Sequence, residues 1–479
     1  MMNLNRRLAV ALVALGTAGA AGAAHAADFK PCDDAASKPA LQGSLCAVEQ
    51  APGDPSGLSG ALAGGIRLFV RKFPAQGAAR GQVWLIAGGP GESGASFYGL
   101  VPRLRQAFPG FDLIMPDHRG TGFSTRLCPD EEAPGSSGGT ALAGAEWATC
   151  FRRLNEHPAY ARQFSETNAA HDLKRLVEHT PRKGKTFLYG VSYGTQLVLR
   201  TLALGTTGVD GVVLDSLVPL QDDATADLSR RSLVTDRIGR EVLAECDARR
   251  SCSQALGGER GEAIYRRLLE RAAADPAVLA KVPGKNLKRF LGSLLDLPKV
   301  ADQIPRLIKE FDSGKDERLK QIFAEVEQEV STFGAFPQSP VSIPLVAMIS
   351  ASENNLQPGR KAEDVKAEET ELLFSSSIPA LLVEPGVPVY QRDAWFARLP
   401  ERLPPTLVLQ GDRDPKTPYD AALRHVDKLR MAGPVQVHTE RFGSHFVLWS
   451  GAGCGKAKIR EFVLGESSQT RCVEVIARE

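Results

Sequence analysis

The segment Gly190-Val191-Ser192-Tyr193-Gly194 carries the clearest chemical signal in this sequence. It matches the pattern G-x-S-x-G, in which a serine occupies a sharp turn between a strand and a helix. The context fits, because an apolar run, 185–189, precedes the segment and a helix-like run, 196–200, follows it. The flanking glycines leave room for the turn, since side chains there would clash across it. The sequence therefore predicts that Ser192 is an exposed nucleophile.

A serine hydroxyl is a weak nucleophile at neutral pH, so it needs a histidine base and a carboxylate that orients the base. With this type of turn, the expected order along the chain is serine, acid, histidine. His425 falls within a helical pattern and His438 within a strand-like run, whereas His445 lies in a loop just after that run. Because doubly wound sheets build their sites at the carboxyl ends of strands, we predict that His445 is the base.

The acid is expected in the loop that follows the preceding predicted strand, 406–409. That loop holds two aspartates, Asp412 and Asp414. Asp412 comes directly after the strand and its glycine, and could instead shape the turn. Asp414 lies further into the loop, where it can better reach a histidine of the next loop, so we predict Asp414 as the acid. The less favoured candidates, which follow an earlier predicted strand, are Asp215, Asp222 and Asp223.

Backbone N–H donors are needed to stabilise the negative charge that develops on a carbonyl oxygen during acyl transfer. The residue after the nucleophile, Tyr193, is expected to supply one donor. The glycine-rich segment 88–94 follows a predicted strand, and we predict Gly89 as the second donor because Pro90 has no N–H. A phosphate-binding loop is disfavoured, since no Gly-Lys-Ser/Thr sequence closes this segment.

Short apolar runs separated by helix-like segments must position these residues. The runs are 66–73, 83–87, 111–115, 186–189, 212–214, 406–409 and 435–442. Such runs are typical of central strands in a parallel sheet. Helical patterns lie at 168–179, 196–204 and 419–431, and two more, 261–274 and 315–330, fall in a long interval with few strand signals. The predicted fold class is α/β, a mostly parallel doubly wound sheet with a large helical insertion between late strands.

The first 26 residues are typical of a cleavable signal peptide. Arg6 and Arg7 precede an apolar run that ends at Ala24-His25-Ala26, which fits an A-x-A cleavage site. The run is short and rich in alanine and glycine, which disfavours a membrane anchor, and no later run is long enough to span a bilayer. We therefore expect a secreted or periplasmic protein cut after Ala26. The two arginines leave the choice between general secretory and twin-arginine export open.

The charges of the 479-residue chain are nearly balanced, with 58 basic and 56 acidic residues. The predicted signal peptide contains two arginines and no acid, so the mature chain has 56 of each. This balance argues against a nucleic-acid partner, and the hydrophobic content of 43% argues against disorder. We predict four segments: the signal peptide 1–26, a first part of the catalytic domain 27–218, the helical insertion 219–400 and a second part of the catalytic domain 401–479.

All eight cysteines lie after the predicted cleavage site. An even number of cysteines in an exported chain favours disulfides. The simplest pairing joins neighbours in sequence, at 32–46, 128–150, 246–252 and 454–472. No C-x-x-C or H-E-x-x-H spacing occurs, so we predict neither a metal site nor a cofactor.

Taken together, these motifs resemble the α/β-hydrolase fold and, more narrowly, the proline iminopeptidase and tripeptidyl aminopeptidase group of serine exopeptidases. The more specific part of the resemblance is the pair formed by Gly88-Gly89-Pro90-Gly91 and the segment DHRGTGFS at 117–124. The secreted, cysteine-bearing form with a long insertion is closer to the tripeptidyl branch. The resemblance implies a triad of Ser192, Asp414 and His445 beneath a helical cap.

The resemblance has two departures. Ile86-Ala87 stands where the group often has His or Asn-Pro before Gly-Gly-Pro, which alters the expected hydrogen bonds of the oxyanion loop. The group also often carries an acid two residues after a cysteine late in the cap, and such acids are thought to bind the free α-amino group of the substrate. Here Ala351-Ser352-Glu353 lacks the cysteine. The resemblance implies Glu353 as a candidate anchor, with a solvated glutamate at a helix end as the alternative.

The expected function is that of an exported serine hydrolase, an aminopeptidase that releases residues or short peptides from substrates with a free N-terminus. An exported carboxylesterase or lipase-like enzyme with the same triad is the main alternative, because ester and amide hydrolysis share this machinery. A non-catalytic binding module on the same fold is a third hypothesis, disfavoured by the complete set of triad residues. The sequence determines neither the number of residues released nor the oligomeric state.

Overall fold

The computed structural model describes residues 28–58, 65–133, 135–136, 144–331, 333, 336–451 and 453–466. At its centre is a nine-stranded sheet with the strand order β1-β2-β3-β5-β4-β6-β7-β8-β9. The strands are β1 (Lys30–Pro31), β2 (Leu45–Pro52), β3 (Gly65–Phe73), β4 (Gly81–Ile86), β5 (Phe111–Asp117), β6 (Lys185–Val191), β7 (Gly211–Asp215), β8 (Thr406–Gly411) and β9 (Val435–Glu440). Neighbours are antiparallel from β1 to β5 in this order and parallel from β5 to β9.

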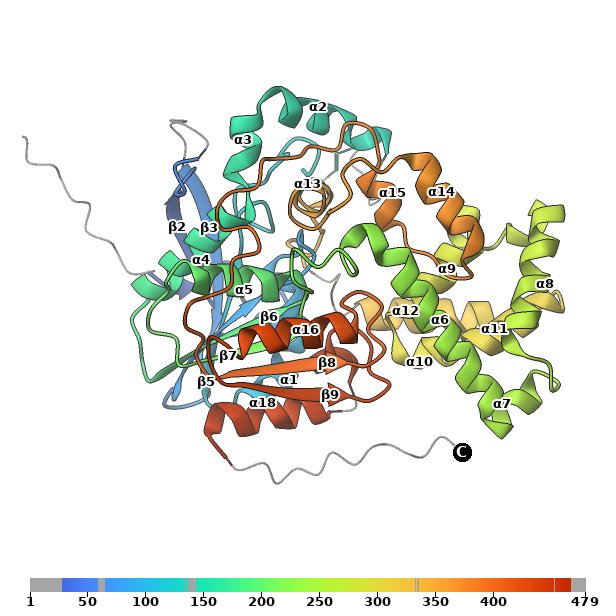
Figure 1. Ribbon diagram of the computed structural model, residues 1–479. Coiled ribbons are helices and arrows are strands. Elements are labelled where there is room, and N and C mark those ends of the chain that lie inside the picture. The colour runs from blue at the N-terminus through green and yellow to red at the C-terminus, as the bar shows by residue number, and fades with distance from the viewer. Residues whose placement is uncertain are drawn as a thin grey trace, which may run out of the picture.

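Helices cover both faces of the sheet (Figure 1). Helices α4 (Glu166–His179), α5 (Tyr193–Ala203) and α16 (Tyr419–Leu429) lie on one face, and α1 (Val101–Ala107) and α18 (Cys454–Leu464) lie on the other. Successive side chains of a strand point to opposite faces. In β6, Leu188 accordingly belongs to the apolar cluster of one face, while Phe187 and Tyr189 belong to that of the other. This two-sided burial confirms the predicted doubly wound α/β architecture.

The seven predicted strands correspond to β3 to β9, with ends that differ by a few residues. β1 and β2 were not predicted. The five predicted helices correspond to α4, α5, α8, α12 and α16. The bounds of the remaining helices outside the insertion are α2 (Ala148–Glu156), α3 (Pro158–Gln163) and α17 (Val447–Ser450).

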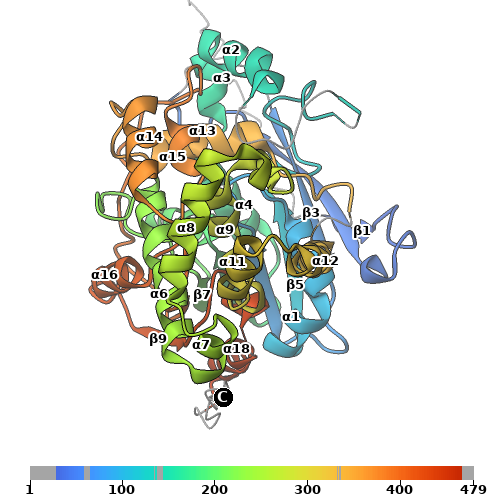
Figure 2. The same ribbon diagram turned by 90° about the vertical axis from the view of Figure 1, so that its right-hand side faces the viewer.

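A helical insertion separates β7 from β8. Among its described residues the regular elements are helices: α6 (Arg231–Ala248), α7 (Arg250–Ala255), α8 (Gly261–Ala274), α9 (Leu287–Leu294), α10 (Pro298–Ala301), α11 (Ile304–Asp312), α12 (Glu317–Ser331), α13 (Ile343–Glu353), α14 (Ala362–Glu371) and α15 (Ile378–Leu382). Helices α6 to α12 form a layer beside the sheet, and Figure 2 shows this layer from the front. They share an apolar core of their own. Helix α13 instead packs in the apolar cluster of one sheet face.

Three of the four predicted disulfides are present: Cys32–Cys46, Cys128–Cys150 and Cys246–Cys252. The fourth pair includes Cys472, which lies outside the described residues, as does the predicted signal peptide. Two clusters of potential metal ligands occur in the described ranges, and each contains both cysteines of a disulfide. A disulfide sulfur is not a thiolate ligand, so neither cluster is a metal site. Across the described helices, none combines the length and the apolar character that a bilayer span requires.

Candidate active site

Ser192 occupies the turn between strand β6 and helix α5. Its backbone has φ 54° and ψ −126°, a conformation that is strained for a residue with a side chain and is typical of functional sites. Packing requires both glycines of the motif. A Cβ at Gly190 would lie 2.4 Å from the Gly194 carbonyl oxygen, and one at Gly194 would lie 2.3 Å from the Ile86 carbonyl oxygen. The strand, the strained turn and the helix form the arrangement that presents a nucleophile beyond the end of a sheet.

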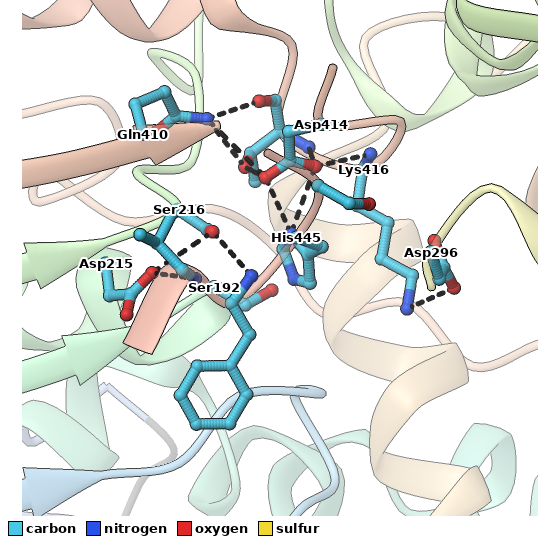
Figure 3. A network of polar contacts seen from close by, with 12 residues as sticks. Ser192, Asp215, Ser216, Asp296, Gln410, Asp414, Lys416 and His445 are labelled. Atoms are coloured by element: carbon cyan, nitrogen blue, oxygen red, sulfur yellow. Dashed lines mark hydrogen bonds and ion pairs between the residues drawn. The ribbon is translucent and has the colours of Figure 1, made fainter. Parts of the chain in front are cut away.

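Asp414 and His445 form a hydrogen-bonded pair next to Ser192. The carboxylate of Asp414 is fully buried, and its Oδ2 accepts a hydrogen bond from His445 Nδ1 at 2.8 Å (Figure 3). The backbone N–H groups of Lys416 and Thr417 also donate to this carboxylate, at 2.7 and 2.8 Å. Burial alone would raise the pKa of Asp414, but the charge of His445 and these hydrogen bonds hold it below its usual value. Asp414 is therefore ionised and can orient the imidazole ring.

Ser192 and His445 line the same cavity, which has a volume of about 380 Å³. Its walls come from the ends of the parallel strands and from the helical insertion, including α6, α9 and α13. Among the hydrogen bonds of the described residues, none joins the Ser192 hydroxyl to His445. Such a bond is often long or misaligned until substrate is bound. The structure thus brings Ser192, His445 and Asp414 to one site, with the contact between base and acid already formed.

The two predicted oxyanion donors lie at this site. Gly89 lines the main cavity, and both Gly89 and Tyr193 line an adjoining cavity of about 60 Å³ that also contains Ser192. Within the described ranges, neither backbone N–H donates a hydrogen bond to another protein group. Gly89 has φ 107°, and a Cβ there would lie 2.2 Å from the Gly91 nitrogen, so the loop requires glycine. Both N–H groups are therefore available to an oxygen of a ligand bound at Ser192.

The loop that carries His445 is anchored to the neighbouring strand β7. Asp215, the last residue of β7, accepts hydrogen bonds from the backbone N–H groups of Val447 and the following residue, at 2.7 and 2.8 Å. Ser216 Oγ accepts one from the Phe446 N–H at 2.8 Å. Burial raises the pKa of Asp215 to about 6, although these N–H groups oppose the rise. Asp215 thus holds the loop of His445, whereas the sequence predicted it only as an alternative acid. Its position at the end of a predicted strand was the only feature of the sequence that pointed to this residue.

The remaining candidates for base and acid lie elsewhere. The ring of His425 is buried in α16, where Nδ1 contacts a backbone carbonyl oxygen at 2.8 Å. His438 Nε2 contacts a Glu440 carboxylate oxygen at 3.0 Å. Asp223 forms an ion pair with Arg424 at 2.7 Å. None of these three candidate side chains lines the cavity of about 380 Å³ that contains Ser192.

The segment 117–124 braces the glycine-rich loop. Asp117, at the end of β5, accepts hydrogen bonds from the backbone N–H groups of Gly94 and Phe123, at 2.9 and 2.8 Å. Arg119 is 1% exposed and donates two hydrogen bonds to Asp172 of α4, at 2.7 and 2.6 Å. Its terminal N–H groups also donate to backbone carbonyl oxygens at the end of β2, just after it, and at the end of α3. Arg119 therefore ties three parts of the catalytic domain together.

Replacing this buried arginine should destabilise the fold. Arg119→Met leaves Asp172 buried without its partner, which costs about 3–5 kcal/mol of unfolding free energy. Urea unfolding followed by circular dichroism measures the loss. The control is Arg182→Met, which removes an exposed ion pair with Asp210 and should cost at most about 1 kcal/mol. Equal losses in the two variants would contradict the bracing role of Arg119.

Glu353 is the predicted site residue that the structure does not bring to the cavity of Ser192. It is 2% exposed at the end of α13. Its carboxylate accepts hydrogen bonds from Arg200 at 3.2 Å, the Tyr390 hydroxyl at 2.8 Å and Gln221 at 2.8 Å. A carboxylate that is paired with a buried arginine is not free for a substrate ammonium group. The structure thus places Glu353 in a buried polar network and not on the wall of that cavity, and its burial excludes the solvated alternative.

The cavity contains charged residues that the sequence did not reveal. Lys416 Nζ forms an ion pair with Asp296 at 2.8 Å (Figure 3). Glu92 of the glycine-rich loop and Arg231 at the start of α6 also line the cavity. The place of Glu92 within segment 88–94 was a signal that could have identified it. Arg231 and Asp296 belong to the insertion, where no motif connects them to Ser192.

Two family models match the chain. Residues 83–246 match the model described as alpha/beta hydrolase fold, and residues 385–471 match the model described as TAP-like protein. No curated protein matches the chain.

Several solved structures are similar to the chain at low sequence identity. An esterase from Thermogutta terrifontis is 15% identical, with 85% of this chain and 96% of that chain covered and a TM-score of 0.35. A laboratory-evolved variant of a potato epoxide hydrolase is 13% identical, with 87% and 99% covered and a TM-score of 0.37. The family models agree with the sheet order and with the strand–turn–helix at Ser192. The chain has the α/β-hydrolase fold and belongs to the superfamily of hydrolases built on it.

Proposed function

We propose that this protein is an exported serine hydrolase that releases residues or short peptides from the N-termini of peptides. The observation that carries the proposal is the arrangement around Ser192, which lies on a strained turn and lines both cavities. His445, bonded to Asp414, lines the main cavity, and the N–H groups of Gly89 and Tyr193 have no acceptor among the described residues. The match of residues 385–471 to the TAP-like model favours a peptidase over an esterase. The signal-like segment 1–26 and the three disulfides support export.

The arrangement supports a reaction in two halves. Ser192 Oγ attacks the scissile carbonyl carbon while His445 takes the hydroxyl proton, and Asp414 stabilises the charged imidazolium that results. The N–H groups of Gly89 and Tyr193 hold the carbonyl oxygen as it becomes negative. The C–N bond then breaks, and His445 gives its proton to the leaving amine. Water, activated by His445, hydrolyses the acyl-enzyme and restores the serine hydroxyl.

Glu92 is suited to bind the free α-amino group that defines an aminopeptidase substrate. It lines the cavity, and among the described residues it has no cationic partner, whereas Asp296 of the same cavity is paired with Lys416. A Cβ built on Gly88 would lie 3.6 Å from Glu92 Oε2 and 3.1 Å from Ser192 Cβ. The carboxylate and the nucleophile are therefore close neighbours. Glu92 thus takes over the anchoring role that the resemblance had implied for Glu353.

A panel of chromogenic substrates tests the proposed function on the purified mature protein. The panel compares aminoacyl and tripeptidyl amides with a free N-terminus, the same amides after N-acetylation, and neutral acyl esters. We expect turnover of the free amides and its loss on N-acetylation. Turnover of the neutral esters with no cleavage of any amide would assign an esterase instead.

Replacing Glu92 should affect binding of the amino terminus selectively. Glu92→Gln removes a charged acceptor, and such an acceptor contributes about 1.5–3 kcal/mol, so KM for a free-amino substrate should rise about tenfold to a hundredfold. Steady-state kinetics with free and N-acetylated ester substrates measures the selectivity. The control is Glu401→Gln, at an exposed glutamate outside the cavity. A Glu92→Gln effect of equal size on both substrates would contradict the anchoring role.

A further inference from the structure

Arg231 places a guanidinium group at the cavity of the nucleophile. It is the first residue of α6, and its side chain lines both the main cavity of about 380 Å³ and the adjoining cavity of about 60 Å³. Ser192 and Gly89 line both cavities as well. Within the part of the chain that the structure describes, the Arg231 side chain forms no hydrogen bond, ion pair or ring contact. Its position at the junction of the two cavities places it near the reacting carbonyl group.

The other cations of this cavity have partners. Arg289 donates to the Glu369 carboxylate at 2.7 and 2.9 Å. Lys416 is paired with Asp296 at 2.8 Å. Arg231 is thus distinguished from its neighbours by its unused donors.

The carboxylates that face Arg231 are already occupied. Burial lowers the pKa of Arg231, while the charges of Asp414 and Asp296 raise it. Asp414 is held by His445 and by the backbone of its own loop, and Asp296 is held by Lys416. A guanidinium stays protonated in proteins and carries five N–H donors, so burying it without acceptors is unfavourable. Binding an anion in the cavity would relieve this cost.

We propose that Arg231 binds a carboxylate of the substrate, and that the enzyme acts on short peptides that carry a carboxylate close to the scissile bond. The proposal builds on the peptidase function proposed above. The planar guanidinium matches a carboxylate through two parallel N–H···O bonds. The cavity volume of about 380 Å³ lies near the lower end of the range of about 300–1,000 Å³ for ligand pockets, which favours short substrates.

The carboxylate has two sources with the same chemistry. It is either the C-terminal group of a di- or tripeptide or the side chain of an aspartate or glutamate next to the scissile bond. A short peptide with a free C-terminus also carries an ammonium group, for which Glu92 provides the opposite charge at the same cavity. The cavity therefore offers one charge of each sign to a zwitterionic peptide.

Two matched substrate pairs test the proposal and separate the sources. The first pair is a tripeptide with a free C-terminal carboxylate and the same tripeptide as its C-terminal amide. The second pair carries glutamate or glutamine next to the scissile bond, with the C-terminus amidated in both. We expect kcat/KM of the native enzyme to be at least tenfold higher for the carboxylate member of one pair, and that pair identifies the source. Equal values within both pairs would overturn the proposal.

Variants then assign the preference to this residue. Arg231→Gln should remove the preference for the carboxylate, and Arg231→Lys should restore part of it, because lysine keeps the charge but not the planar geometry. The matched control, Arg289→Gln, changes another arginine of the same cavity and should keep the preference. If Arg231→Gln lowers kcat/KM for the carboxylate and its amide by the same factor, Arg231 supports the triad instead and the proposal is wrong.

A binding measurement separates this proposal from the peptidase proposal. A fluorophosphonate that labels Ser192 reports occupancy of the cavity without peptide cleavage. In at least one of the two pairs, the carboxylate member should slow labelling of the native protein at least tenfold more than its neutral partner does, and Arg231→Gln should abolish the difference. If no peptide is cleaved but this difference is found, the peptidase function fails while the carboxylate site stands. If peptides are cleaved and the two members protect equally in both pairs, the carboxylate site fails alone.

Discussion

Ser192→Ala is expected to lower kcat by about 10⁶-fold while the protein stays folded. The variant removes the nucleophile but keeps the N–H donors and the cavity, so a small residual rate over the uncatalysed reaction should persist. In the described structure the serine hydroxyl forms no hydrogen bond with another side chain or backbone group, and its loss should therefore leave the unfolding temperature unchanged. Turnover of a free-amino peptide amide measures the first effect, and thermal unfolding measures the second.

Labelling with a fluorophosphonate provides the control for this variant. Ser216 is a second serine with positive φ, 56°, and it is buried directly after the neighbouring strand β7. Its Oγ accepts a hydrogen bond from the Phe446 N–H. Ser216→Ala should still react with the reagent, whereas Ser192→Ala should not. Activity of Ser192→Ala within tenfold of the native value, or labelling of Ser192→Ala, would refute the assignment of the nucleophile.

Asp414→Asn is expected to lower kcat by about 10⁴-fold with little change in KM. The native carboxylate accepts from His445 Nδ1 at 2.8 Å and from the backbone N–H groups of Lys416 and Thr417 at 2.7 and 2.8 Å. An amide oxygen can satisfy the two backbone donors, which leaves the NH₂ group facing His445. The imidazole then keeps its proton on the nitrogen that should face the serine, and it cannot act as a base.

Asp412→Asn is the matched control, since Asp412 is the other aspartate of the same loop. In the described structure its side chain has no contact with His445 and does not line the cavity. The variant should therefore keep kcat within a few-fold of the native value. Steady-state kinetics of both variants on one substrate measures the difference. If Asp412→Asn were the slower enzyme, the choice between the two acids would be reversed.

The local sequence was sufficient to predict the turn of the nucleophile and the strand and helix on either side of it. A strand, a serine between two glycines and a helix are adjacent in the chain, so the strained conformation of Ser192 follows from a short segment. Asp414 and His445 follow successive parallel strands, β8 and β9. Neighbouring parallel strands place their carboxyl ends at the same edge of the sheet. The proximity of these two residues was therefore predictable without knowledge of the rest of the fold.

Strand β2 was missed because its alternation of apolar and polar residues is reversed at Val48 and Glu49. Its buried side chains include Glu49, which is 8% exposed, while Val48 on its other side is 53% exposed. Alternation of apolar and polar residues predicts a strand only when the apolar side faces the core. Burial raises the pKa of Glu49, which is the physical cost of this inversion. The reversal at Val48 and Glu49 interrupts the alternation in the middle of the strand, so hydrophobicity does not identify it.

The contacts of the insertion were not predictable for a different reason. Glu353 is paired with Arg200, which lies 153 residues earlier in the chain, and no local pattern indicates such a partner. Arg231 reaches the cavity only because α6 begins there, and the start of α6 relative to Ser192 depends on how the whole insertion packs. Residues of an insertion that determine substrate specificity are therefore identified from the structure and not from a sequence motif.

Helix α13 belongs to the insertion by sequence but to the catalytic domain by packing. All of its residues are buried, and the Ser342 N–H just before it donates to the Gly91 carbonyl oxygen at 2.9 Å. A Cβ on Gly91 would lie 2.4 Å from the Ser342 carbonyl oxygen, so the glycine-rich loop rests directly on this helix. The part of the insertion that is exchangeable between enzymes of this fold is therefore limited to α6 to α12, residues 231–331. A replacement that also included α13 would remove the support of the oxyanion loop.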